Sequence, residues 1–406
     1  MGLLEEEGVP FVERSEDELY NMLIPEFRKN EKILIKSITS FIILLKSSNK
    51  TIDNILRETR RSSSKRDNFL IKNIVQPIYL SYQETLSNSN LLDFTDLILR
   101  ATRICDRQEG RSYKYIIVDE FQDISLDRFE FLKALRKGVP PAKLFCVGDD
   151  WQSIYRFSGS DISLVNDFSN YFGPTELCKI TTTYRFGQPL IDISAHFIQK
   201  NSSQIRKRVN AFDSKARTRL SLHPYRESNY NSRVKQLIDS IPEDKSILLL
   251  GRYSFDDNYL SKEFNSIRKG SRFYYMIGNR EIQLMTIHKS KGLEADYVII
   301  LKCNDEDYGF PSLISDDSIL KYVLSKAESH PFAEERRVLY VGITRAKIET
   351  MIMYREDSPS IFIDELLNPD GKPIRTENRH PNAYKRWTKK ADQFLLAIER
   401  KGKSIK

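Results

Sequence analysis

A short apolar run that ends directly in two adjacent carboxylates constrains this chain more than any other feature. The run Tyr115 to Val118 is followed at once by Asp119 and Glu120. From Tyr113 onward, similar apolar runs alternate with longer amphipathic stretches, which is the pattern of an α/β fold built on a parallel sheet. In such folds ligands bind at the carboxyl ends of the strands. The sequence therefore predicts an α/β protein with a polar site where this strand ends.

The alternating pattern divides into two sheet regions. In the first we expect strands at residues 115–118 and 144–147, with a helix at 126–135 between them. In the second we expect a helix at residues 334–346 and strands at residues 246–250, 282–287, 297–301 and 350–354.

The first ninety residues differ from the rest. From Leu3 to about Leu91, apolar residues recur at three- and four-residue spacing, which predicts amphipathic helices. Within them, the basic and serine-rich run Arg57 to Arg66 is expected to be a solvated loop, with phosphate contact as the alternative.

The composition indicates which kinds of partner and which cellular compartment to expect. The formal charge of +8 favours an acidic partner such as nucleic acid. Four widely separated cysteines without a C-x-x-C pair argue against a zinc site or a disulfide framework, so we expect buried reduced thiols in a cytoplasmic protein. The most apolar stretch, Ile33 to Leu45, is too short to cross a bilayer, and the acidic amino terminus does not resemble a signal peptide, so no membrane partner is expected.

Two strand ends carry residues suited to nucleotide chemistry. At the first, one carboxylate could hold Mg²⁺ while its neighbour polarises a water molecule, although Asp and Glu also favour the first turn of a helix. At the second, Gln152 follows a strand and could sense a γ-phosphate. Beyond it, Tyr155 and Phe157 flank Arg156, an interleaving that suits either a stacking platform for single-stranded bases or an ordinary core.

Three later segments offer further phosphate and base contacts. Tyr184 and Arg185 provide a ring and a guanidinium. The loop from Thr286 to Asp296 is rich in hydroxyl, histidine and lysine groups, which suits phosphate contacts, although a single histidine is more often structural.

The third of these segments is the helix predicted at 334–346. Its spacing would point Leu339 and Tyr340 toward the sheet and let Arg337 and Arg345 reach a cleft, although basic helices are otherwise solvated faces.

These five segments occur in the order and approximate spacing of motifs II to VI of UvrD/Rep-type superfamily 1 DNA helicases. The chain resembles that family over about residues 91–367. Its motif sequences are most similar to those of the helicase IV branch, as in Gly148-Asp149-Asp150-Trp151-Gln152. The resemblance implies two RecA-like parallel-sheet domains, the first incomplete, with a helical amino-terminal region. It also implies ATP and Mg²⁺ as cofactors and single-stranded or partly duplex DNA as the partner.

The resemblance also implies a role for individual residues. By it, Asp119 would help to hold Mg²⁺, Glu120 would activate water, and Gln152 would report on the γ-phosphate. Arg185 and Arg345 would contact the γ-phosphate. The remaining ATP-binding residues would be Tyr184 on the adenine, Glu294 near the ribose, Gly292 and Arg337. The residues facing DNA would be Tyr155, Phe157, His288 and Lys289.

Domain boundaries follow from the same comparison. We expect a helical, accessory-1B-like region at 1–90, the remainder of the first RecA-like domain at 91–186, and the second at 187–356. Fewer than one hundred residues separate Phe186 from Leu284, so no large accessory insertion is expected there. Residues 357–406 would form a polar tail with the start of a helix-turn-helix module.

One departure from the family concerns the phosphate-binding loop. No G-x-x-x-x-G-K-[ST] motif precedes Asp119, and the single Gly-Lys-Ser, at 402–404, has Ala397 where the first glycine belongs. The expectation is therefore a truncated ATP-dependent 3′–5′ helicase. The alternative is a non-catalytic DNA-binding subunit or helicase remnant, which lacks its own phosphate loop or uses that of a separate chain.

Overall fold

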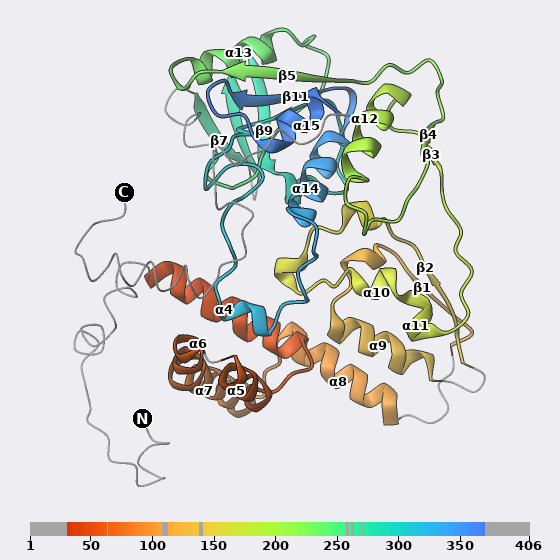
Figure 1. Cartoon of the computed structure of the whole chain (residues 1–406), viewed down its shortest axis with the longest axis vertical. Coiled ribbons are helices and arrows are strands. Elements are labelled where there is room, and N and C mark those ends of the chain that lie inside the picture. The colour runs from red at the N-terminus through yellow and green to blue at the C-terminus, as the bar shows by residue number, and fades with distance from the viewer. Residues whose placement is uncertain are drawn as a thin grey trace.

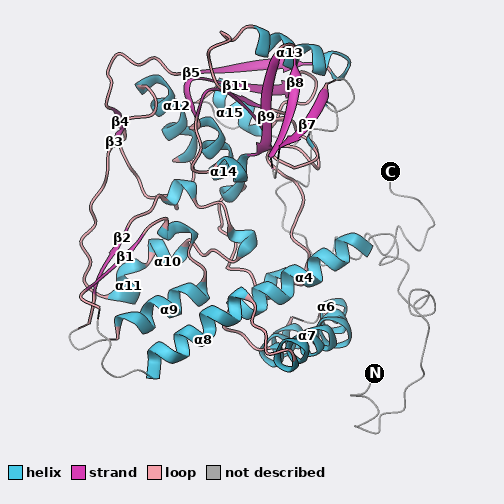
Figure 2. Ribbon diagram, turned by 180° about the vertical axis from the view of Figure 1, so that it is seen from behind, coloured by secondary structure: helices cyan, strands magenta, loops and turns pink. Residues whose placement is uncertain are grey.

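The computed structural model describes most of the chain between residues 31 and 369. Within that range the residues left undescribed are 63, 108–112, 138–140, 257–259, 261–263 and 270–271. The predictions for residues 1–30 and for the helix-turn-helix start at 370–406 lie outside the described residues. Three units are seen in Figures 1 and 2: a group of helices, a small unit around two strands, and a larger unit around a seven-stranded sheet.

The helical unit precedes the first strand. Its elements are α4 (Glu31–Ser47), α5 (Ile52–Arg61), α6 (Lys65–Leu70), the π-helix η1 (Ile71–Val75) and α7 (Gln76–Asn88). The next helix, α8 (Phe94–Arg107), packs on the first sheet unit, and Lys46 on α4 joins the two by ion pairs to Asp93 (2.5 Å) and Asp96 (2.7 Å).

The run Arg57 to Arg66 is not the solvated loop that its charges suggested. Helix α5 continues to Arg61 and α6 begins at Lys65, so only a short turn separates them. Helix α5 is amphipathic: Ile55, Leu56 and Thr59 face the buried core of the helical unit while the arginines face solvent. The apolar face outweighs the charge pattern here.

The first sheet unit contains two parallel strands, β1 (Tyr115–Val118) and β2 (Lys143–Cys146). Between them lie η2 (Phe121–Asp123) and α9 (Leu126–Arg136), and after them come η3 (Asp150–Gln152), η4 (Arg156–Ser158), α10 (Ser163–Asn166) and α11 (Phe168–Phe172). One face of this sheet packs against these helices. The other face is exposed: the side chains of Ile117 and Phe145 are 74% and 62% accessible.

The second sheet unit is larger. Its strand order is β5-β11-β10-β6-β9-β8-β7, in which the first five strands are parallel and β7 and β8 add an antiparallel hairpin. The strands are β5 (Arg219–Tyr225), β6 (Ile247–Gly251), β7 (Asn265–Lys269), β8 (Arg272–Ile277), β9 (Arg280–Thr286), β10 (Ala295–Ile300) and β11 (Ala346–Arg355). The predicted α/β class with mainly parallel sheets is confirmed.

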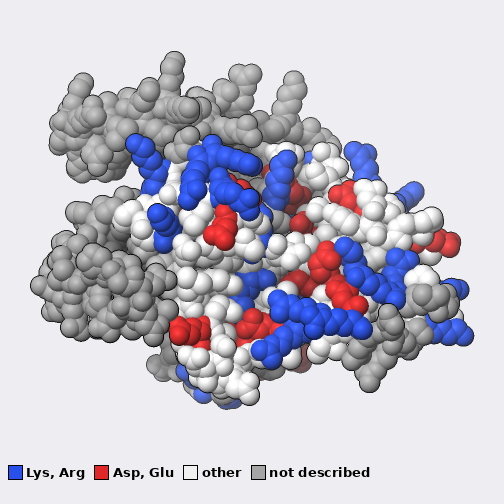
Figure 3. Space-filling view, turned by 90° about the horizontal axis from the view of Figure 1, so that it is seen from below, with Lys and Arg blue, Asp and Glu red and all other residues white. Residues whose placement is uncertain are grey.

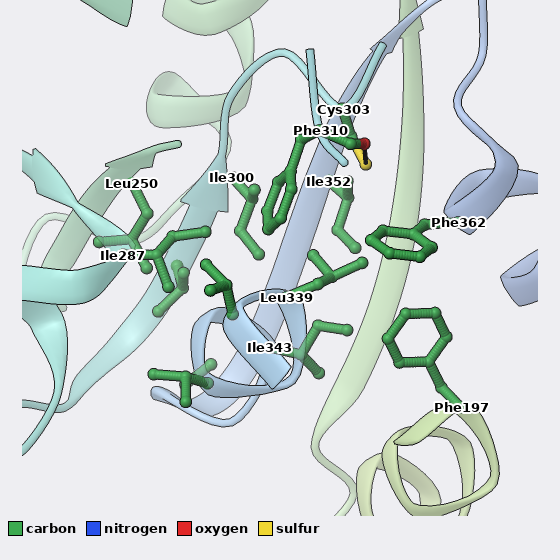
Figure 4. Close-up of a cluster of buried hydrophobic side chains, with 14 of the residues drawn as sticks. Phe197, Leu250, Ile287, Ile300, Cys303, Phe310, Leu339, Ile343, Ile352 and Phe362 are labelled. Atoms are coloured by element: carbon green, nitrogen blue, oxygen red, sulfur yellow. Dashed lines mark hydrogen bonds between the residues drawn. The ribbon is translucent and has the colours of Figure 1, made fainter. Parts of the chain in front are cut away.

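Helices cover both faces of this sheet. They are α12 (Gln188–Ile198), α14 (Ala333–Ile343) and α15 (Ile361–Leu367) on one face, and α13 (Tyr230–Asp239) on the other. Alternate residues of β6 and β10 point to the two cores, as a strand that is buried on both sides requires. Figure 4 shows the first core, where Phe197, Phe310 and Phe362 gather beside Leu339 of α14.

A segment of the second unit leaves it to join the helical unit. The turn η8 (Leu320–Tyr322) packs its apolar residues into the core of that unit. Lys50 Nζ donates to the carbonyl of Tyr322 (2.7 Å), and Lys321 pairs with Asp67 (2.8 Å). This segment lies inside the predicted second domain at 187–356, yet it contacts the first hundred residues (Figure 1).

The cysteines are less uniform than predicted. Cys303 is buried and burial raises its pKa to about 12, but Cys178 is exposed and Cys105 and Cys146 are half-buried. All four are free thiols. Among the helices that the structure describes, none combines the length and the apolar character needed to span a membrane.

Candidate nucleotide and DNA site

The carboxylate pair stands at the end of β1, as the sequence predicted. Asp119 and Glu120 are both exposed, and the Asp119 carboxylate accepts the backbone N–H of Glu120 (2.8 Å). Glu120 has a φ of 50°, in the left-handed region that non-glycine residues rarely occupy. Such strain tends to persist at functional sites because the surroundings enforce it. Here the sharp turn directs the chain into η2.

A buried glutamine links the two strand ends. Gln122 Nε2 donates to the Glu120 carboxylate, and its Oε1 accepts the backbone N–H of Asp149 (2.8 Å). Gly148 makes this bridge possible, because a Cβ at that position would lie 2.6 Å from Gln122 Oε1. The first carboxylate loop and the loop after β2 are therefore held in one fixed arrangement.

Gln152 lies where the two sheet units meet. Its Nε2 donates to Asp149 Oδ2 (2.7 Å), and its Oε1 is 3.4 Å from Nη2 of Arg345, which follows the end of α14. The Arg345 side chain is buried, and this burial, together with the charge of Arg185, lowers its pKa to about 10. The predicted γ-phosphate sensor and one predicted phosphate-contacting arginine are thus brought into contact from opposite units.

Arg185 and Glu294 form the next part of the site. Arg185 Nε pairs with Glu294 Oε2 (3.1 Å), and Glu294 also pairs with Lys347 (2.6 Å). The hydrogen bond from Lys347, aided by that from Arg185, lowers the pKa of Glu294. Gly292, two residues before Glu294, has a φ of 82° and shapes the exposed turn.

Tyr184 has an aromatic neighbour that the sequence did not reveal. The short strands β3 (Thr182–Thr183) and β4 (Asn210–Ala211) run in parallel, and the residues after them, Tyr184 and Phe212, place their ring centroids 4.4 Å apart. The two side chains are 77% and 67% exposed, which is unusual for large rings. A two-residue strand has no periodicity to detect, so Phe212 was missed.

The predicted DNA-facing residues come together from different units. Tyr155 and Phe157 have ring centroids 6.0 Å apart, and Phe157 lies 5.5 Å from the ring of His288. The Tyr155 hydroxyl donates to the backbone carbonyl of His288 (3.0 Å). Phe157 and Lys289 are exposed at this position.

Arg156 does not belong to this aromatic group, contrary to the predicted interleaving. Its guanidinium pairs with Asp316 (2.8 Å) and donates to the carbonyl of Ser325 (3.0 and 3.2 Å). It therefore anchors the segment that runs to the helical unit, and the stacking surface consists of rings without the intervening cation.

The burial of His288 should make the stability of the protein depend on pH. Burial, helped by the charge of Arg252, lowers its pKa from 6.5 to about 4. The unfolded chain then binds this proton first as pH falls, so the free energy of unfolding should decrease from about pH 6.5 to about pH 4 and lose nothing more from this group below that. His288→Gln should flatten this slope, by up to about 1.4 kcal/mol per pH unit, in urea unfolding at several pH values. An unchanged slope in His288→Gln would contradict the assignment.

Lys291 is a second residue that sequence reasoning passed over. Its Nζ pairs with Asp123 and lies 3.4 Å from Glu120 Oε2 and 3.1 Å from the carbonyl of Gln152. It therefore connects the second unit to both loops of the first. Its place two residues after Lys289, in the same predicted phosphate loop, was the available signal.

Two predictions about helix α14 need correction. Arg337 is fully buried, pairs with Glu328 (2.6 Å) and donates to the carbonyl of Ser153 (2.5 Å), so it does not reach the cleft as a cofactor ligand. Tyr340 packs edge-on against Trp151 (5.4 Å) and not against the sheet. Both residues join α14 to the loop that carries Gln152, because that loop covers the face of the helix away from the sheet.

The side chains at this site meet some, but not all, of the requirements for binding Mg²⁺ and ATP. Asp119 makes no ion pair within the described residues, which leaves its carboxylate free for a cation that also takes phosphate oxygens. The part of the chain that the structure describes contains no group of three or more metal-ligating side chains, so no all-protein cage is present there. The residues predicted to stack on a base and to contact the γ-phosphate lie near the junction of the two sheet units, but the sequence lacks the glycine-rich loop that cradles the other phosphates.

A carboxylate pair, a glutamine and two arginines lie where the two α/β units meet. The chain belongs to the UvrD/Rep helicase family. The UvrD/REP helicase N-terminal domain matches residues 10–173, and the UvrD-like helicase C-terminal domain matches residues 271–357.

Three known proteins illustrate what this chain is similar to. DNA helicase IV of Escherichia coli is 36% identical over 73% of this chain and 42% of its own length. A probable DNA helicase of Mycoplasma pneumoniae is 28% identical over 66% of this chain and 49% of its own. The chain thus spans less than half the length of these relatives. A solved C-terminal domain of a possible DNA helicase from Lactobacillus is 17% identical, with a TM-score of 0.29 over 46% of this chain and 96% of that domain.

Proposed function

We propose that this chain supplies the nucleotide-sensing and DNA-tracking parts of an ATP-dependent 3′–5′ DNA helicase. The contact between Gln152 and Arg345 carries the proposal, because it joins the carboxylate loops of one unit to the arginine of the other. A motor of this type works by opening and closing such a cleft as nucleotide is bound and released.

Each group at the cleft has a chemical task in this proposal. Bound Mg²⁺ would neutralise developing charge on the phosphates, and Asp119 is the side chain that would hold it. Glu120 accepts a proton from water at its exposed carboxylate. Arg345 and Arg185 offset negative charge that grows on the transferred phosphoryl group, and buried Arg345 does so where water screens it least.

Lys291 opposes this role of Glu120 through its charge. Its ammonium group lies between Asp123 and Glu120 and neutralises part of the charge that Glu120 needs to act as a base. In this proposal, the distance between Lys291 and Glu120 changes as the cleft opens and closes, so the charge beside Glu120 is tied to the position of the second unit.

The DNA surface is proposed from the aromatic cluster and not from charge. Figure 3 shows Lys and Arg side chains in several groups with Asp and Glu between them, and no continuous basic stripe on that face. Rings stack on bases of any sequence, which suits a motor that moves along single-stranded DNA.

Replacing Phe157 by alanine should weaken binding of single-stranded DNA by about 1–3 kcal/mol, the usual contribution of one stacked base. Tyr155→Ala should do the same. Fluorescence anisotropy with a labelled oligonucleotide measures this change. Phe69, an exposed aromatic residue on α6, is the matched control, and its replacement by alanine should have no effect. Equal losses in Phe157→Ala and Phe69→Ala would contradict a DNA platform at this cluster.

The absence of a G-x-x-x-x-G-K-[ST] motif from the sequence favours a second candidate, a non-catalytic DNA-binding subunit or helicase remnant. DNA-stimulated ATP hydrolysis separates the two. It should be measured on the chain alone and mixed with the product of an adjacent upstream reading frame that carries such a loop. Stimulated turnover in either mixture supports the motor, and DNA binding without turnover in both supports the second candidate.

A further inference from the structure

A half-buried lysine lies behind the predicted γ-phosphate sensor and has no role in the site described so far. Lys207 belongs to the connection between α12 and β4, and its side chain is 16% exposed. Its Nζ pairs with Asp149 and with Asp150 Oδ1 (2.6 Å), the two carboxylates that follow Gly148. Although burial opposes it, the charges of these carboxylates raise the pKa of Lys207.

The surroundings fix this lysine to the sensor loop. Asp150 Oδ2 accepts the backbone N–H of Ile205 (2.7 Å), and Trp151 Nε1 donates to the carbonyl of the same residue (3.0 Å). The Lys207 ammonium also lies over the Trp151 ring, 4.9 Å from its centroid. The connection and the loop therefore form one packed body, in which Lys207 is the cation between two neighbouring carboxylates.

The contact that matters for function is the hydrogen bond between Asp149 and Gln152. Asp149 uses Oδ1 for Lys207 and Oδ2 for the side-chain amide of Gln152 (2.7 Å). That hydrogen bond decides which end of the amide faces outward: the NH₂ group turns to Asp149, so the oxygen faces Arg345. Without the cation, the Asp149 carboxylate would be repelled by buried Asp150 and would keep only the backbone N–H of Trp151 (3.1 Å) as a partner at Oδ1.

We propose that Lys207 is a positioning residue that, through Asp149, holds the Gln152 amide in the orientation that faces Arg345. The same connection continues into β4 and Phe212, so it ties the sensor to the aromatic pair at Tyr184. The part of this inference that concerns γ-phosphate sensing rests on the proposed function, whereas the orientation of Gln152 does not.

The orientation is tested without nucleotide. In protein made with isotope-labelled glutamine, the side-chain amide resonance of Gln152 is assigned by its absence in Gln152→Ala. We expect this resonance to shift and narrow in Lys207→Met as the amide becomes mobile, and to keep its position in Lys207→Arg. Arg208→Met removes the same charge from an exposed neighbouring position and should leave the resonance unchanged. An unshifted resonance in Lys207→Met would overturn the proposal.

A second variant covers the case in which Lys207→Met does not fold. The double change Lys207→Met with Asp150→Asn removes the repulsion between adjacent carboxylates and keeps an oxygen for the backbone N–H of Ile205. Asp149 still loses its ion pair with Lys207 in this double variant. Its Gln152 resonance should therefore shift as well, by less than in Lys207→Met, whereas Asp150→Asn alone should leave it in place. A resonance that shifts only in Asp150→Asn would assign the positioning to Asp150 and overturn the role of Lys207.

Nucleotide affinity then separates this proposal from the proposed function. The ratio of the Kd for ADP to that for a non-hydrolysable ATP analogue should fall by about 5-fold or more in Lys207→Met, with little further change when Gln152→Ala is added. A shifted resonance together with no nucleotide binding in the unmodified protein would retain the positioning role and reject the proposed function. Equal losses of affinity for both nucleotides would mean a purely structural role.

Discussion

Replacing Glu120 by glutamine should lower DNA-stimulated ATP hydrolysis by about 10²–10⁴-fold, the usual contribution of a general base. Glutamine keeps the size of the side chain and the hydrogen bond partner of Gln122, but it cannot take a proton from water. Nucleotide affinity should therefore be retained. Steady-state turnover and equilibrium binding, measured in whichever assembly hydrolyses ATP, together check this result.

The matched control for this variant is Glu130→Gln. Glu130 is a surface carboxylate on α9 that pairs with Lys133 (3.1 Å), so its loss removes the same charge away from the cleft. It should not change turnover. If Glu120→Gln retained full turnover, the base would have to be another group, and Asp123, whose pKa burial raises, would be the next candidate.

Replacing Arg345 by lysine should lower turnover by at least about 10³-fold, because an arginine that stabilises a transferred phosphoryl group contributes about 10³–10⁵-fold. Lysine keeps a positive charge but cannot donate from a planar fork. It also loses the bond from Arg345 Nε to the carbonyl of Val341 (2.9 Å), which holds the side chain in place. Single-turnover measurements would show the loss in the chemical step and not in nucleotide binding.

Arg219→Lys is the control for the effect of an arginine-to-lysine change in general. Arg219 is largely exposed on β5 and pairs with Glu349 (3.0 Å), at a different strand edge of the same sheet. Its replacement should leave turnover unchanged. An equal decrease in both variants would indicate damage to the second sheet unit, and unchanged turnover in Arg345→Lys would remove this arginine from the chemistry.

The features predicted most accurately from the sequence are those that a local pattern of residues determines. The strands before Asp119 and Gly148 were placed within one residue, because an apolar run buried on one sheet face has sharp polar limits. The hairpin β7–β8 was not predicted. Strand β7 (Asn265–Lys269) has no apolar run and is exposed throughout. The aromatic and apolar run of β8 (Arg272–Ile277) was present in the sequence but was overlooked. The predicted domain boundaries remain predictions.

The errors share a physical cause: they concern side chains whose partners lie far away in sequence. Helical spacing correctly placed Leu339 in the sheet-facing core, but it could not show that Trp151 would cover Tyr340 or that Glu328 would take Arg337. Phe212 was missed for the same reason, because its contact with Tyr184 depends on the pairing of two short strands.

The ion pairs of Lys46 and the contacts of the turn η8 connect the three units of the chain in a ring, each unit to the other two. The helical unit is fastened to the first sheet unit through Lys46 and to the second through Lys50 and Asp67, while the two sheet units also meet directly at Gln152 and Arg345. Because the helical unit contacts both sheet units, it must move when the distance between those two units changes. In the proposed motor, any movement that opens the cleft must therefore break one of these contacts or rotate the helical unit, so α4 would be the part of the chain that moves most.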